Sequence, residues 1–99
     1  KGLKYKTNFI QLDSVAISII ELVIIKELEF SVITKLVRKE HLSKIQNERN
    51  RNQYLEDINQ KIKLLTGFKS NFLIISKSTF DARYKSVIFN KMDYGKIMK

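Results

Sequence analysis

The chain contains no cysteine, only three glycines and a single histidine. Without cysteine it has neither a disulfide framework nor a thiolate metal site. Gly2, Gly67 and Gly95 stand far apart, so the sequence has no glycine-rich phosphate loop. His41 is the only imidazole, and a lone histidine on a basic helix is far more often a solvated residue than a metal ligand. We therefore expect no bound metal and no cofactor.

The sequence also lacks an uninterrupted apolar segment of membrane-spanning length. Its most apolar stretch, Val15–Ile25, is interrupted by Ser18 and Glu21. A spanning helix needs about 20 predominantly apolar residues, which this stretch does not supply. The start at Lys1 is not followed by the long apolar core of a signal peptide. We expect a cytoplasmic protein with no membrane partner.

No catalytic pattern is visible in the chain. The residues around each serine do not form a nucleophile elbow. Glu27 and Glu29 are two positions apart, which separates them on a helix and brings them to one face of a strand. A solvated flank is the simpler interpretation of this pair. The sequence therefore does not favour an enzyme.

Positive charge is abundant and unevenly distributed. The chain has 19 Lys and Arg against 10 Asp and Glu, a net charge of +9. Residues 1–32 are neutral, with four lysines and four acids, so the whole surplus lies in residues 33–99. A neutral, apolar start followed by a basic remainder indicates one part that packs or associates and another that faces a polyanion.

Ninety-nine residues make one small domain, and its first half is predicted to be helical. We divide it into an N-terminal segment (1–13), a helical part (14–66), a β-hairpin (68–90) and a tail (91–99). Residues 8–12 alternate loosely, as in a short strand or entry segment. Asp13 and Ser14 are good N-cap residues for a helix over Val15–Leu28, whose wide apolar stripe predicts burial on more than one side.

The next stretch predicts either two helices or one. Ser31 is a candidate cap for a helix over Val32–Ile45, whose inner face would carry Ile33, Leu36 or Val37, and Ile45. Tyr54–Leu65 is the clearest helix of the chain, with an apolar stripe of Leu55, Ile58, Ile62 and Leu65, and it is ended by Gly67. Between them, residues 46–53 contain no apolar side chain and are interpreted as a turn or exposed connection. Because they contain neither Gly nor Pro, one continuous helix over residues 31–66 remains open.

The second half of the chain predicts a β-hairpin. Asn71–Ser76 and Tyr84–Phe89 are apolar runs of strand length, and Lys77–Arg83 between them suits a loop. The tail, residues 90–99, is polar and is expected to pack back as a last helical turn through Met92, Tyr94, Ile97 and Met98. The fold class is therefore α+β.

This order of elements resembles that of winged helix–turn–helix proteins, a class that includes bacterial repressors and plasmid-partition adaptors. The resemblance covers roughly residues 14–90 and rests on element order alone. It implies that the third helix enters the major groove of DNA and that the hairpin, the wing, contacts the flanking backbone or minor groove. The residues it points to for DNA binding are Arg49, Arg51, Asn52, Gln53, Gln60 and Lys63 on the helix, and Lys77, Arg83 and Lys85 on the wing.

A homodimer is expected from the first helix. A helix that is apolar on three sides is hard to cover within so short a chain, and many DNA regulators dimerise to bind two half-sites. The interface would be formed by Ile17, Ile20, Val23 and Ile24. The alternative is a central core helix covered by its own chain. The preferred hypothesis is thus a dimeric protein that binds double-stranded DNA, as a transcriptional regulator or as a partition adaptor of plasmid or phage DNA.

Two other functions use the same residues differently. An RNA-binding or ribosome-associated protein would stack bases on aromatic side chains, which gather around the hairpin: Phe68, Phe72, Phe80, Tyr84 and Phe89. A helical protein-interaction module would need a continuous helix over residues 31–66. The polar gap at residues 46–53 argues against a sustained heptad seam there.

Overall fold

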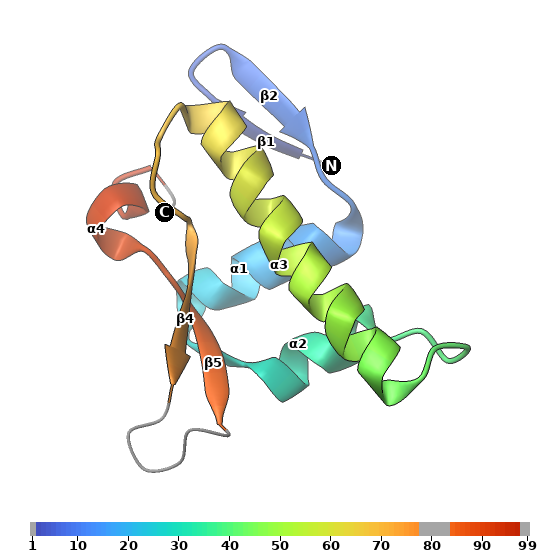
Figure 1. Cartoon of the computed structure of the whole chain (residues 1–99). Helices are drawn as coiled ribbons and strands as arrows, with labels where there is room; N and C mark the ends of the chain where they lie inside the picture. The colour runs from blue at the N-terminus through green and yellow to red at the C-terminus, as the bar shows by residue number, and fades with distance from the viewer. Residues whose placement is uncertain (1, 78–83, 98–99) are drawn as a thin grey trace.

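Helix α1 (Ser14–Ile25) begins where the sequence predicts. The Asp13 side chain accepts a hydrogen bond from the Ala16 N–H at 2.7 Å, which satisfies a free donor of the first helical turn. The computed structural model in Figure 1 describes residues 2–77 and 84–97. The predicted end of this helix, at Leu28, is wrong. The helix stops at Ile25 because Leu28 and Glu29 form strand β3 and pair with another strand.

Helix α1 is the centre of the core. Ile17, Ile20 and Val23 are all buried by the chain itself, and Ile24 is half-buried. The chain itself therefore covers most of the apolar face of α1 that had favoured a dimer. This is the alternative in which α1 is a central core helix. Of the four residues expected at a dimer interface, only Ile24 retains substantial exposure.

Two helices follow, and they are separate. Helix α2 spans Phe30–Val37 and helix α3 spans Lys44–Thr66, so one continuous helix over residues 31–66 is excluded. Ser31 lies inside α2 and does not cap it, because the N-cap position is Glu29. Ile45, expected on the inner face of the second helix, lies in the first turn of α3 and is 63% exposed. The predicted stripe of the third helix is correct, since its four apolar residues are all buried: Leu55, Ile58, Ile62 and Leu65.

The predicted hairpin is present and belongs to a three-stranded sheet. Strands β4 (Leu73–Lys77) and β5 (Lys85–Phe89) pair antiparallel, with Ile75 opposite Val87. Strand β3 (Leu28–Glu29) pairs with the other side of β5, so the strand order is β3–β5–β4. The short strand between α1 and α2 thereby ties the hairpin to the helical part. Residues 78–83 lie outside the described residues.

The N-terminal segment forms a second hairpin. Strand β1 (Gly2–Tyr5) pairs antiparallel with strand β2 (Asn8–Gln11), in agreement with the short strand expected at residues 8–12. Lys6 in the turn has a φ of 55°, in the left-handed region that tight turns use. The hairpin lies beside the C-terminal end of α3, where the Asn8 amide donates to the Leu65 carbonyl at 3.3 Å (Figure 1).

The chain then returns to the core through a short helix, α4 (Lys91–Tyr94). The expectation that the tail packs back is confirmed for Tyr94, which is fully buried, whereas Met92 is 96% exposed. Tyr94 contacts Phe68 and Phe72 with ring centroids 5.0 and 5.3 Å apart, and its hydroxyl donates to the Ser70 carbonyl at 2.6 Å. Met98, also expected to pack here, lies outside the described residues. Over those residues the fold is small, compact and α+β, with four helices and two β-hairpins.

Candidate nucleic-acid interface

Helix α3 is the longest element and carries most of the candidate site. Its start is set by a capping box, in which Ser43 accepts from the Gln46 N–H at 3.2 Å and the Gln46 side chain accepts from the Ser43 N–H at 2.9 Å. Its end is set by Gly67, whose φ of 77° is the left-handed conformation favourable to glycine. The 23 residues between them form a rod about 35 Å long at 1.5 Å per residue.

The two sides of α3 differ sharply. One side packs against α2, the β1–β2 hairpin and β4 and carries the buried residues, and the opposite side is exposed (Figure 1). Of the six predicted helix residues, four are exposed and one, Lys63, is half-buried on the flank. The exposed four are Arg49, Asn52, Gln53 and Gln60. Glu56 and Asp57 are exposed on the same side, and Asp57 accepts a hydrogen bond from the Gln53 amide at 2.9 Å.

The polar stretch 46–53 is not a connection, and that prediction is wrong. It forms the first turns of α3, and the true connection is residues 38–43. Buried Asn47 bonds the Lys39 N–H at 2.9 Å and donates to the carbonyls of Lys39 and Leu42. Asn50 donates to the Val37 carbonyl at the end of α2. These hydrogen bonds offset the desolvation of the two amide side chains, and their partners are backbone groups at the end of α2 and in the connection after it.

Arg51 lies apart from the exposed face. It is only 9% exposed, and its guanidinium stacks on the Phe30 ring at 4.4 Å. Its N–H groups donate to Thr34 Oγ1 at 3.0 Å and to Asn52 Oδ1 at 3.0 and 3.1 Å. Burial lowers the pKa of this guanidinium, and the nearby Glu48 carboxylate partly offsets that effect. Its contacts join α2 to α3, and its role as a direct DNA contact stays a prediction.

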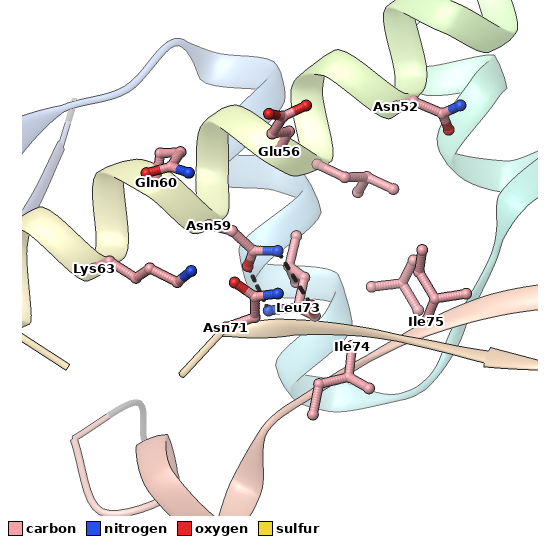
Figure 2. A pocket seen from close by; sticks show the side chains of 11 residues that line it. Asn52, Glu56, Asn59, Gln60, Lys63, Asn71, Leu73, Ile74 and Ile75 are labelled. Carbon is pink, nitrogen blue, oxygen red and sulfur yellow. Dashed lines mark hydrogen bonds between the residues drawn. The ribbon is translucent and has the colours of Figure 1, made fainter. Parts of the chain in front are cut away.

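A groove of about 480 Å³ runs between α3 and strand β4 (Figure 2). The apolar side chains of Ile74 and Ile75, exposed by 40% and 57%, line its strand side. Its helix side carries amide and charged side chains of α3: Asn52, Glu56, Asn59, Gln60 and Lys63. Asn71, just before β4, also lines the groove. Asn59 holds the strand in place, since its amide bonds both the N–H and the C=O of Leu73.

The described end of the β4–β5 hairpin is positively charged. Lys77 and Lys85 are directly opposite each other in the β4–β5 ladder, and both are exposed. Tyr84, next to Lys85, is 67% exposed. Arg83 and Phe80, which the sequence also pointed to, lie outside the described residues. Most of the other hairpin aromatics are core residues, with Phe72 fully buried, Phe89 8% exposed and Phe68 half-buried.

This arrangement offers hydrogen-bonding groups on a helix beside positive charge on a hairpin. Asparagine and glutamine form paired hydrogen bonds with adenine, and arginine pairs with guanine or phosphate. Lys77 and Lys85 suit phosphate contacts, which position a protein without reading sequence. The two acids on the helix, Glu56 and Asp57, repel phosphates and accept from cytosine.

Sequence reasoning missed two residues that line the groove between α3 and β4, Asn59 and Asn71. Ser43-Lys44-Ile45-Gln46 matches the capping-box pattern, so the start of α3 was available from the sequence. Nothing comparable marks Asn59 or Asn71, because their roles depend on a strand that arrives later in the chain. Within the described residues, no His, Asp or Glu cluster is suited to hold a metal ion.

The chain matches no model of a known protein family, no curated protein and no solved structure. None of the helices in residues 2–77 and 84–97 is long and apolar enough to span a membrane.

Proposed function

We propose that this protein binds double-stranded DNA in the manner of a winged helix–turn–helix protein. Helix α3 would lie in the major groove, and the β4–β5 hairpin would contact the flanking backbone. Three helices followed by a hairpin, the order on which the resemblance rests, support this assignment. The six-residue connection over residues 38–43 brings α2 and α3 together as a helix–turn–helix unit.

One observation carries the proposal: the solvent-facing side of α3 presents Arg49, Asn52, Gln53 and Gln60 along one helix face. Residues 49 and 60 are eleven positions apart, or about 16 Å along the helix axis. That length suits contact with several successive base pairs, which are about 3.4 Å apart. The basic surplus of residues 33–99 supplies the attraction to phosphate that such contacts need.

The biological role that fits is a transcriptional regulator or a DNA-site adaptor in plasmid or phage partition. Both need the same DNA-facing surface, and both act in the cytoplasm. A homodimer would present two α3 helices to two half-sites. Because Ile17, Ile20 and Val23 are internal, such a dimer would have to use other surfaces of the chain.

Fluorescence anisotropy with a mixed pool of duplex DNA at several salt concentrations tests the proposal. We expect duplex binding that weakens steeply with salt, because each neutralised phosphate releases counterions. Arg49→Ala should weaken binding by roughly 5- to 150-fold, the equivalent of about 1–3 kcal/mol for one good base contact. Gln60→Ala should act in the same direction.

Two controls separate the α3 face from charge in general. Lys26→Ala removes one positive charge from the end of α1, and Glu21→Ala changes an exposed α1 residue. Both should leave duplex affinity within about twofold. Equal losses for Arg49→Ala and Lys26→Ala would show that the α3 face is not the binding surface.

RNA binding is the second candidate, because exposed Tyr84 beside Lys85 pairs a stacking surface with a cation. Single-stranded RNA added as competitor distinguishes the two. Displacement of the duplex by an equal amount of RNA, with loss of that displacement in Tyr84→Ala, would favour RNA.

A further inference from the structure

A second groove, of about 540 Å³, lies between α2 and the first half of α3. One wall comes from α2 and the residue that follows it, with Thr34, Lys35 and Arg38. The other wall comes from α3, with Lys44, Glu48 and Arg51. The size is within the range of small-ligand sites, roughly 300–1,000 Å³. Of its lining residues, only Arg51 was predicted from the sequence to bind a ligand.

The groove concentrates positive charge. It contains four cations, Lys35, Arg38, Lys44 and Arg51, against the single carboxylate of Glu48. Three of the cations are exposed at the rim, so they can reorient toward a ligand. Charges of one sign in a concave site focus the field more strongly than the same charges on a flat surface.

Buried Arg51 forms the floor of the groove, and its neighbours fix the orientation of its guanidinium. Its orientation is held by the Phe30 ring at 4.4 Å and by hydrogen bonds to Thr34 and Asn52. Those bonds use three of the five N–H donors of a guanidinium, which leaves two without a partner among the described residues. A buried, oriented guanidinium with free donors is the geometry that binds phosphate oxygens in pairs.

We propose that the α2–α3 groove is an anion site that holds a phosphate group, with Arg51 at its floor and Lys35, Arg38 and Lys44 at its rim. Two sources supply that chemistry, the backbone of a nucleic acid and a small phosphate compound. The site is separate from the exposed face of α3, so this inference does not rest on the proposed base contacts.

The first experiment titrates the ¹⁵N-labelled protein with sodium pyrophosphate, against sodium chloride at equal ionic strength. We expect shifts in the amides of residues 34–38 and 44–48 and in the Arg51 Nε–H signal. The double variant Lys35→Gln/Arg38→Gln should lose them. The control Lys26→Gln/Lys96→Gln removes the same charge from exposed positions outside the groove and should keep them.

The second experiment measures duplex binding for the same pairs. If the groove holds backbone phosphate, the groove pair weakens binding by about tenfold and lowers the slope of log affinity against log salt by about 1–2, while the control pair changes both less. Pyrophosphate shifts without a groove-specific duplex effect indicate a small phosphate ligand, and a groove-specific duplex effect, with or without those shifts, indicates the backbone.

The inference is overturned if pyrophosphate shifts no groove signal beyond chloride and the two pairs weaken duplex binding equally. Arg51→Lys provides a further variant, provided that its circular dichroism matches that of the wild type. Lysine keeps the positive charge but lacks the paired N–H donors of the guanidinium. The amide signals of Lys35 and Arg38 should therefore shift less with pyrophosphate. Failure of Arg49→Ala to affect duplex binding would refute the α3 interface and leave the pyrophosphate result standing.

Discussion

The side chain of Asn59 bonds the backbone of Leu73 at both its N–H, at 2.7 Å, and its C=O, at 3.2 Å. Leu73 begins β4, which is an edge strand because the sheet order is β3–β5–β4. The amide thus completes the hydrogen bonding of an otherwise open strand edge. It also joins the proposed DNA-reading helix to the wing, so that the two surfaces keep one relative position.

Asn59→Ala should therefore lower both stability and duplex affinity. Losing one side chain leaves two partly buried backbone groups without their partner, and we expect a fall of about 2–4 kcal/mol in the free energy of unfolding. Urea unfolding followed by circular dichroism measures it. Gln60→Ala, on the exposed face, should change stability by less than about 0.5 kcal/mol. Equal effects of the two variants would contradict this role for Asn59.

Two lysines of the β4–β5 hairpin test the contribution of charge to DNA binding without disturbing the fold. Lys77 and Lys85 are exposed and directly opposite each other, and like charges in that position repel. Replacing both with Gln should leave the free energy of unfolding unchanged or slightly higher. Duplex affinity should fall for every DNA sequence alike, and the salt slope should decrease by up to about 1.8. A loss of affinity confined to one sequence would contradict phosphate contact.

Apolar spacing predicted the core more accurately than polarity predicted the surface. Burial imposes a period on local sequence. It made two features recognisable, the stripe from Leu55 to Leu65 and the two strands of the β4–β5 hairpin. Residues 46–53 were misassigned because amides and arginine normally indicate solvent. Here Asn47, Asn50 and Arg51 satisfy backbone and side-chain groups of α2 and the turn, which are partners that the local pattern does not reveal.

In the candidate site, too, some features follow from local spacing and others depend on distant parts of the chain. The outward position of Arg49, Asn52 and Gln60 follows from helical geometry once the apolar stripe is known. The α2–α3 groove and the Asn59 contact require the path of the chain between elements. The same limit explains the error at Leu28. This residue continues the apolar pattern of α1, and its place in the sheet depends on a pairing partner, Val87, that lies 59 positions away.

Ile20→Ala should distinguish a core helix from a dimer interface. Ile20 is 3% exposed within a single chain, so its truncation should leave a cavity and lower the free energy of unfolding by about 2–5 kcal/mol. The oligomeric state should not change under conditions where the variant remains folded. Sedimentation at several concentrations and urea unfolding give the two readouts. Dissociation of a wild-type dimer with unchanged stability would restore α1 as the interface.

Stability should decline at alkaline pH because of two tyrosines. Burial raises the pKa of Tyr94, and burial together with the Asp13 hydrogen bond raises the pKa of Tyr54. The unfolded chain therefore releases these protons first as pH rises above about 10, which favours unfolding. The contribution is fully present below that pH and is lost as pH rises through the folded-state pKa.

Tyr94→Phe isolates one of these contributions. The variant should be less stable at neutral pH, because the Ser70 carbonyl loses its donor, and its stability should fall less between pH 9 and 11. Urea unfolding at each pH measures the slope. Tyr84→Phe, at an exposed position, should follow the wild-type slope. A Tyr94→Phe slope equal to that of the wild type would show that Tyr94 does not contribute.

Arg51→Lys tests whether this buried guanidinium acts by its shape or by its charge alone. Lysine keeps the positive charge but cannot donate to Thr34 and Asn52 together in a planar fork, and it loses the stack on Phe30. We expect a loss of about 1–3 kcal/mol in the free energy of unfolding. Arg49→Lys, the same change at an exposed position of the same helix, should stay within about 0.5 kcal/mol. Unfolding curves of the two variants in urea make the comparison directly. If Arg51→Lys is as stable as the wild type, the guanidinium contacts between α2 and α3 contribute no net stability, and charge alone accounts for arginine at this position.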